Sequence, residues 1–182
     1  MDFETIETSR LFLRKTTQEV MDHVFTSMEP REQMKFLGLT DIQQLQEQER
    51  RYNDGLSTFN RKFLYFHLID KNSQENIGWC GYHTWYIDHY RAEIGYMINE
   101  SHQRKGLMTE ALNAIIPYGF SAMSLNRIEA FIGLENPPSL KLLQNFNFVQ
   151  EGVLREHYKA KVKPEDSLLF SLLKQDYYSN KK

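Results

Sequence analysis

The stretch His102-Gln103-Arg104-Lys105-Gly106-Leu107-Met108-Thr109-Glu110-Ala111 joins a predicted strand to a predicted helix. Residues 91–98 alternate before it, which predicts a β-strand with Ala92, Ile94, Tyr96 and Ile98 on one face and Arg91, Glu93, Gly95 and Met97 on the other. After the stretch, apolar residues recur at the helical period of about 3.6 residues: Met108, Leu112, Ile115, Ile116, Phe120 and Met123. The sequence therefore predicts a strand, a short loop and a long helix.

The start of that helix is predicted to bind an anion. Backbone N–H groups in a first helical turn have no partner within the helix and lie at the positive end of its dipole. Gly106 allows the backbone to come close to a ligand, and Arg104 and Lys105 add positive charge. A phosphate is the expected ligand.

The spacing Gln103-x-x-Gly106-x-Met108, followed by Thr109-Glu110-Ala111, resembles the coenzyme A pyrophosphate loop of the GNAT acetyltransferase superfamily. Four further segments follow the order of the RimJ/RimL-type branch, which acetylates N-terminal amines of ribosomal proteins: residues 6–14, 92–96, 135–139 and 166–174. The resemblance implies a single α/β domain over residues 1–182. Its expected sheet is mixed and strongly twisted, has about seven strands flanked by about four helices, and splays between strands 4 and 5, where the coenzyme lies.

Composition narrows the function classes. The chain has 182 residues, of which 41% are hydrophobic, enough for one core. A formal charge of −2 argues against nucleic acid as a ligand, and the single cysteine argues against a disulfide or a cysteine-rich metal site. No apolar run approaches the roughly 18 residues that span a bilayer. We expect a cytoplasmic protein without metal or membrane association, either a monomer or a homodimer.

The local patterns also predict the remaining elements. A Thr16-x-x-Glu19 capping box opens a helix to about Ser27, and a second polar helix extends from Thr40-x-x-Gln43 to Gly55. The other expected elements are a first strand at 11–13, a hairpin of 61–69 and 77–86, a strand at 127–132, a helix at 137–146, a hairpin of 148–158 and 167–173, and a frayed tail at 177–182.

The resemblance assigns coenzyme contacts residue by residue. The pyrophosphate loop comprises Gln103, Arg104, Lys105, Gly106, Leu107, Met108 and Thr109. The N–H of Met97 or Ile98 is expected to donate to the thioester carbonyl if the strand bulges near Gly95; the alternative for Gly95 is a close helix–strand contact. Asn136 is expected at the pantetheine arm and Ser139 near the thioester sulfur. Asn136 also suits a helix N-cap before Pro137.

Catalysis requires a base for the amine and a proton for the departing thiolate. Glu93 is the candidate base, acting through a water; the alternative is a glutamate that is solvated or ion-paired, with Arg91 as one candidate partner. Many GNAT members use a tyrosine seven residues after the asparagine as acid, but this chain has Leu143 there. The acid is therefore Ser139, a water or a tyrosine from elsewhere. His83 is a further candidate for the cleft wall, although satisfied histidines are more common.

These features predict an acetyl-CoA-dependent N-acetyltransferase acting on the N-terminal α-amine of a ribosomal protein or of another protein. One alternative is an acetyltransferase of a small-molecule amine such as a polyamine. The missing tyrosine leaves a third alternative, a coenzyme-A-binding module without transfer activity.

Overall fold

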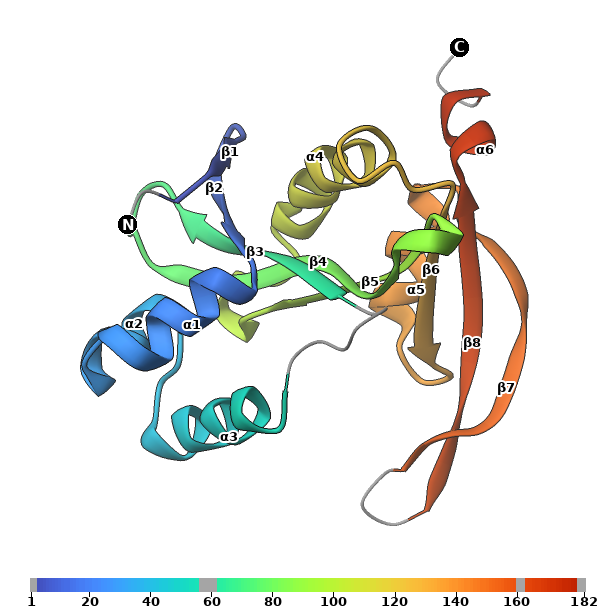
Figure 1. Cartoon of the computed structure of the whole chain (residues 1–182). Coiled ribbons are helices and arrows are strands. Elements are labelled where there is room, and N and C mark those ends of the chain that lie inside the picture. Colours follow the sequence, from blue (N-terminus) through green and yellow to red (C-terminus); the bar gives the residue numbers. More distant parts are fainter. Residues whose placement is uncertain (1–2, 56–61, 160–162, 180–182) are drawn as a thin grey trace.

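A mixed sheet of eight strands forms the centre of the computed structural model, which describes residues 3–55, 62–159 and 163–179 (Figure 1). The strand order is β1-β2-β3-β4-β5-β6-β8-β7. The strands are β1 (Thr5–Glu7), β2 (Leu11–Thr16), β3 (Lys62–Asp70), β4 (Asn76–Tyr86), β5 (Arg91–Ile98), β6 (Arg127–Gly133), β7 (Val149–Lys159) and β8 (Pro164–Leu173). The helices are α1 (Gln18–Ser27), α2 (Pro30–Leu37), α3 (Ile42–Asn53), α4 (Leu107–Ser121), α5 (Pro137–Asn145) and α6 (Lys174–Ser179), with 3-10 turns at Ile87–His89 and Glu100–His102.

The sheet splays between β5 and β6. These strands pair in parallel at three positions, the last of which joins Glu93 to Glu129, and then diverge. The sequence predicted a splay between its fourth and fifth strands. Because the three-residue strand β1 was not predicted, those two strands correspond to β5 and β6, and the prediction is confirmed. All other neighbouring strands are antiparallel.

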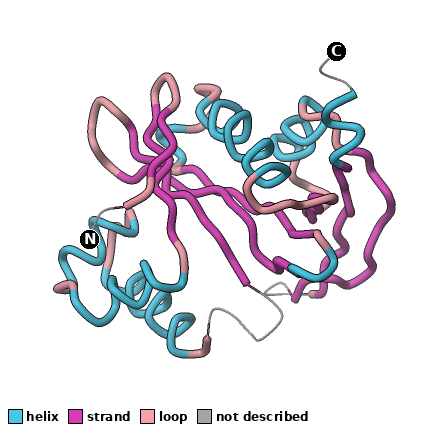
Figure 2. The backbone as a smooth tube through the Cα atoms, turned by 45° about the horizontal axis from the view of Figure 1, so that its top comes forward, coloured by secondary structure: helices cyan, strands magenta, loops and turns pink. Residues whose placement is uncertain are grey.

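Helices cover both faces of the sheet (Figure 2). On one face, α4 contributes Leu112, Ile115, Ile116 and Phe120 to the main core, all completely buried, which confirms the predicted apolar stripe. Leu143 of α5 lies in the same core. On the opposite face, α1 and α2 enclose a smaller cluster of Val20, Val24 and Phe36.

Both predicted helix starts near the N-terminus are displaced by one residue. Thr16 is the last residue of β2, and Thr17 is the N-cap of α1 without a side-chain capping bond. At α3 the cap is Asp41, whose carboxylate accepts a hydrogen bond from the Gln44 N–H at 2.9 Å. Aspartate is a stronger N-cap than threonine, which explains the choice.

The predicted frayed tail is wrong for residues 177–179, which belong to α6; residues 180–182 lie outside the described residues. Tyr177 is buried, and its ring centroid lies 5.3 Å from that of Phe120. In the described part of the chain, no helix has the length and apolar character needed to cross a membrane.

Candidate active site

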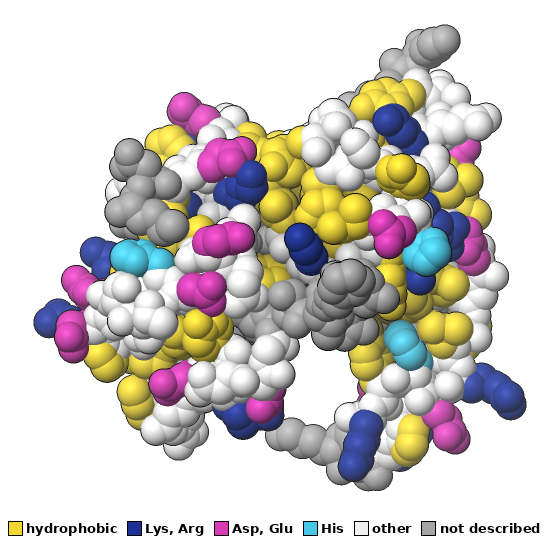
Figure 3. All heavy atoms as spheres, viewed as in Figure 1, with side chains coloured by type: hydrophobic (Ala, Val, Ile, Leu, Met, Phe, Trp, Pro, Cys, Tyr) yellow, Lys and Arg dark blue, Asp and Glu magenta, His cyan; other side chains and the backbone are white. Residues whose placement is uncertain are grey.

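The splay opens a cleft of about 270 Å³ between β5 and β6. In the space-filling view the molecule is hollowed between α3 and the strands β7 and β8 (Figure 3). Residues from five elements line the cleft: Trp79 and His83; Glu93, Ile94, Gly95 and Tyr96; Ala130, Phe131, Ile132 and Gly133; Asn136 and Ser139, which flank or open α5; and Tyr158. Glu93, Asn136 and Ser139, all predicted site residues, are thus brought together.

The cleft has two chemically different sides. Ala92 and Ile94 pack into the core beneath α4, and Tyr96 shares their strand face. Glu93 points to the other face, which its antiparallel register partner His83 also occupies. Because β5 loses its partner beyond Glu93, side chains from both faces reach one opening. Tyr96, Asn136 and Ser139 lie toward the α4 and α5 side, and His83 and Glu93 lie on the opposite side.

The loop before α4 has the backbone geometry of an anion site. Gly106, the N-cap, adopts a left-handed conformation with φ of 74°, and Arg104 adopts a φ of 59°. The first hydrogen bond of the helix runs from the Glu110 N–H to the Gly106 carbonyl at 3.0 Å. The N–H groups of residues 107–109 therefore have no acceptor within the helix. A groove of about 490 Å³ adjoins this turn, lined by Thr8, Ser9, Gly106, Thr109, Glu110, Asn113 and Ala114.

Side chains around this loop have fixed positions. The Gln103 amide donates to the Ile98 carbonyl at 3.2 Å, which ties the loop to the end of β5. Leu107 is buried in the main core, so its side chain anchors the helix start. These two predicted coenzyme residues therefore use their side chains to hold the loop.

An ionic brace, defined here as Thr8, Arg10 and Glu110, joins the β1–β2 turn to the same loop. Glu110 accepts hydrogen bonds from the Thr8 hydroxyl at 2.7 Å and from the Arg10 N–H and Nε at 2.6 Å each. Arg10 Nη1 also donates to the Lys105 carbonyl at 2.8 Å. Although burial raises the pKa of Glu110, these hydrogen bonds lower it below its usual value. The prediction from sequence missed this brace, because its members lie about a hundred residues apart.

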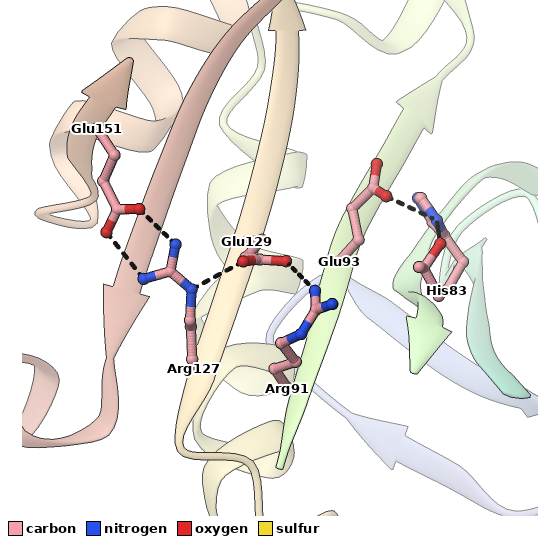
Figure 4. A network of polar contacts seen from close by, with 7 residues as sticks. His83, Arg91, Glu93, Arg127, Glu129 and Glu151 are labelled. Atoms are coloured by element: carbon pink, nitrogen blue, oxygen red, sulfur yellow. Dashed lines mark hydrogen bonds and ion pairs between the residues drawn. The ribbon is translucent and has the colours of Figure 1, made fainter. Parts of the chain in front are cut away.

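Glu93 is paired with a histidine (Figure 4). Its Oε2 lies 3.5 Å from His83 Nδ1, and the Glu93 side chain is 15% exposed. The Thr84 hydroxyl lies 3.2 Å from the same ring nitrogen. Arg91, suggested as an ionic partner of Glu93, is not that partner, because Arg91 Nη1 binds Glu129 at 2.6 Å.

Glu129 is the parallel register partner of Glu93, and it is held by two arginines. Besides the ion pair with Arg91, Glu129 forms one with Arg127, whose Nε lies 2.8 Å from the carboxylate. Arg127 also forms an ion pair with Glu151 on β7 (Figure 4). Its negative charge is therefore compensated. Glu93 lies beside the His83 imidazole, which is charged only when it is protonated.

Both predicted explanations for Gly95 are wrong. The register between β4 and β5 is continuous from Gly78/Ile98 to His83/Glu93, so β5 has no bulge at Gly95; the irregularity lies in β4 after His83. A Cβ at Gly95 would not meet a helix either. It would lie 2.9 Å from His83 Nε2 and 3.2 Å from Trp79 Cη2. The absence of a side chain at Gly95 leaves the space in which the His83 imidazole lies against the strand.

The missing bulge does not remove the candidate donors Met97 and Ile98. Beyond Glu93, the β6-facing edge of β5 has no partner strand among the described residues. Alternate backbone N–H groups along that edge point into the cleft in a regular strand. One of the two N–H groups therefore remains a candidate donor without a bulge.

The turn before α5 confirms the predicted capping. Asn136 Oδ1 accepts a hydrogen bond from the Ser139 N–H at 3.2 Å, and Pro137 begins the helix. Leu143, which replaces the family's tyrosine, is completely buried. After the helix, Asn147 adopts the predicted left-handed conformation with φ of 59°.

Three tyrosines add to the electrostatics of the cleft region. Burial, with a further contribution from the charge of Glu93, raises the pKa of Tyr65 to about 12. The same two causes raise the pKa of Tyr158. Burial also raises the pKa of Tyr96, whereas the neighbouring Ser139 hydroxyl lowers it by a smaller amount. Tyr96 was predicted only to share a strand face with Ala92 and Ile94, and its place in the cleft depends on the splay.

Comparison with known proteins identifies the family to which these features belong. A sequence profile of the acetyltransferase (GNAT) domain matches residues 10–149. The N-acetyltransferase p20 of Bacillus licheniformis is 38% identical over 177 residues, which cover 96% of this chain and 98% of that protein.

Solved structures share the fold. The spermidine/spermine N-acetyltransferase SpeG of Vibrio cholerae, in mutant forms, superposes with a TM-score of 0.70 at 20% identity, covering 95% of this chain and 99% of SpeG. The ribosomal-protein-S5-alanine acetyltransferase of Vibrio fischeri gives a TM-score of 0.66 at 23% identity, covering 96% and 98%. At these identities the likeness shows the fold alone.

Proposed function

The chain belongs to the GNAT acetyltransferase family and is an N-acetyltransferase, and from that premise we propose that it acetylates the N-terminal α-amine of a protein, with a ribosomal protein as first choice. The observation that carries this proposal is the two-sided cleft. A thioester entering from the side of Asn136 and Ser139 meets an amine entering from the side of His83 and Glu93. A cytoplasmic location fits such an acceptor.

On the coenzyme side, we assign the pyrophosphate to the N–H groups of residues 104–109, with Arg104 and Lys105 adding charge. Gln103, Leu107 and the ionic brace hold this loop. Asn136 contacts the pantetheine arm, and the N–H of Met97 or Ile98 donates to the thioester carbonyl.

On the acceptor side, Glu93 removes a proton from the bound ammonium through a water, and His83 neighbours the carboxylate. The amine lone pair then attacks the thioester carbon, and the C–S bond breaks as the amide forms. The second amine proton leaves as the nitrogen becomes an amide, and the thiolate takes up one proton. Ser139 lies on the thiolate side and takes part in that proton relay.

The charges of the cleft favour a protein N-terminus over a polyamine. A polyamine carries several positive charges and is best bound by several carboxylates. Among the described residues that line the cleft, Glu93 is the one carboxylate, and nearby Glu129 is already compensated by two arginines. A single ammonium followed by an uncharged chain matches this arrangement.

An acceptor panel tests the proposal. Thiol release from acetyl-CoA is measured with peptides that carry the N-termini of ribosomal proteins, with the same peptides blocked at the α-amine, and with spermidine and spermine. We expect turnover only with free α-amines. Preferred use of spermidine would establish the polyamine alternative, and binding of coenzyme A without turnover on any amine would establish the non-catalytic one.

The ionic brace gives a separate prediction about coenzyme affinity. Arg10 Nη1 holds the Lys105 carbonyl, so the N–H of the same peptide unit, that of Gly106, points the other way. Glu110→Gln weakens the charge-assisted bonds that hold Arg10, and we expect the Kd of coenzyme A to rise about 5- to 10-fold, on the order of 1 kcal/mol.

The sign of this change is informative. Removing a negative charge beside an anion site would tighten binding if only long-range charge mattered. Calorimetry that shows tighter binding by Glu110→Gln would therefore refute the brace. Lys15→Met is the matched control, because Lys15 pairs with Glu4 at the end of the β1–β2 hairpin opposite the turn that carries Thr8 and Arg10. It should leave the affinity unchanged.

A further inference from the structure

The hydroxyl of Tyr96 is buried in the cleft, where the Ser139 hydroxyl neighbours it without meeting hydrogen-bond geometry, and no other described residue offers it a partner. Four buried polar atoms of the described chain share this lack of a partner, those of Arg14, Gln18, Tyr96 and Ser167, and only Tyr96 lines the cleft. A buried hydroxyl without a partner destabilises a fold by about 1–3 kcal/mol. Its presence in the cleft therefore calls for a partner that arrives with the substrate.

The position of Tyr96 in the fold matches one chemical need of the reaction. Its ring packs against the main core, so the hydroxyl is held in place. The hydroxyl lies on the same side of the cleft as Asn136 and Ser139, opposite Glu93 and His83. That is the side to which the proposed function assigns the thioester sulfur. Burial raises the pKa of Tyr96, which keeps the phenol protonated and able to donate at neutral pH.

The departing thiolate takes up a proton, and a relay through Ser139 needs a group that supplies this proton. Leu143, at the position of the family's tyrosine, has no proton to give and is enclosed in the core. The Ser139 hydroxyl is a much weaker acid than a phenol. Glu93 lies on the other side of the cleft, where it accepts a proton from the amine.

We propose that Tyr96 is the general acid, donating its phenolic proton to the sulfur of coenzyme A as the C–S bond breaks. The sulfur leaves with the bonding electrons and takes the proton, either directly or through the Ser139 hydroxyl, which gives a neutral thiol and a tyrosinate. The tyrosinate regains its proton from the nitrogen that is becoming an amide, through water in the cleft. The inference rests on the proposed function only in placing the thioester in this cleft.

Tyr96→Phe tests the inference, because it removes one oxygen and keeps the ring. We expect kcat to fall about 10- to 100-fold, toward the low end of general-acid effects because the thiolate is a fairly good leaving group. The Kd of coenzyme A should stay within twofold. The melting temperature should stay the same or rise, since an unpaired buried hydroxyl has been removed.

Tyr82→Phe is the matched control. Its hydroxyl is also buried, but it donates to the Ile115 carbonyl at 2.8 Å and lies outside the cleft. This variant should lose thermal stability and keep its activity, the reverse of Tyr96→Phe. A loss of stability in Tyr96→Phe with full activity would overturn the inference.

A second assay tests the role of Tyr96 without any acceptor amine, so its result does not depend on which amine is the natural acceptor. Slow hydrolysis of acetyl-CoA without any amine needs the same proton on the thiolate, so it should also fall in Tyr96→Phe. Retained hydrolysis and retained transfer would overturn the role of Tyr96 while leaving the proposed function intact. A larger loss in Ser139→Ala than in Tyr96→Phe would assign the acid to Ser139 instead. An inactive wild type in both assays would overturn both proposals.

Discussion

Glu93→Gln is expected to lower kcat about 100-fold or more with a saturating peptide amine, because general-base assistance contributes about 10²–10⁴-fold. The side chain lines the cleft opposite Ser139 and Tyr96, and its carboxylate neighbours His83. Glutamine keeps the shape and loses the proton acceptor. The Kd of acetyl-CoA should stay near the wild-type value, since Glu93 lies on the acceptor side. Stopped assays of thiol release between pH 6 and 9, with calorimetry for the coenzyme, measure both quantities.

Glu129→Gln is the control for this substitution. Glu129 is the register partner of Glu93, yet it is bound by Arg91 and Arg127 and does not line the cleft. We expect this variant to lose stability and to retain turnover within a few-fold. If Glu93→Gln loses less than about threefold in kcat throughout the pH range, Glu93 is not the base, and the acceptor side would need a different one.

Local signals were sufficient to predict the elements that hold the coenzyme side. The alternation of residues 91–98 predicted β5, and the apolar stripe predicted α4, because each signal lies within the element itself. Gly106 could be placed at the helix start for the same reason. The short strand β1 has only three residues, too few for a pattern, and it forms because β2 offers it an antiparallel edge.

The acceptor side depends on contacts that no local pattern contains. Gly95 is explained by the imidazole of His83, which reaches it from the neighbouring strand. Tyr96 shares the core-facing side of β5 by alternation, and only the divergence of β6 exposes it to the cleft. The pair of Arg10 and Glu110 could not be inferred either, although both residues lie in segments that resemble the family.

This division has a physical basis. In the proposed site the coenzyme is bound mainly by backbone groups, whose positions follow from helix and strand geometry and so from periodic sequence signals. The proposed acceptor side is built from side chains that meet across strands, and their partners are set by register and by the splay. Prediction of the acceptor therefore requires the three-dimensional arrangement. The number of carboxylates that line the cleft, which favours one kind of acceptor over another, can be counted only in the structure.

Gly106→Trp is expected to weaken coenzyme A binding by about 100-fold or more, by filling the space where the N–H groups of the loop meet the pyrophosphate. A Cβ at Gly106 would have Arg10 Nη2 at 3.6 Å as its nearest neighbour, so the side chain can be accommodated at the surface beside the groove. The φ of 74° disfavours any side chain, at a cost of about 1–2 kcal/mol. A moderate fall in melting temperature should accompany the loss of binding.

Two further variants distinguish the effect of blocking the anion site from the effect of straining the backbone. Gly106→Ala has the same φ and no bulk, so it should lose similar stability and keep the coenzyme Kd within a few-fold. Gly55→Trp places the same side chain at a φ of 92° with nothing within 4 Å, far from the loop, and should leave the Kd unchanged. Calorimetric titration with coenzyme A is the measurement, with circular dichroism to follow the fold. If Gly106→Trp bound coenzyme A as tightly as the wild type, the pyrophosphate would have to lie elsewhere. The roles given to Gln103 and the ionic brace would then be lost as well, because both depend on the loop being the anion site.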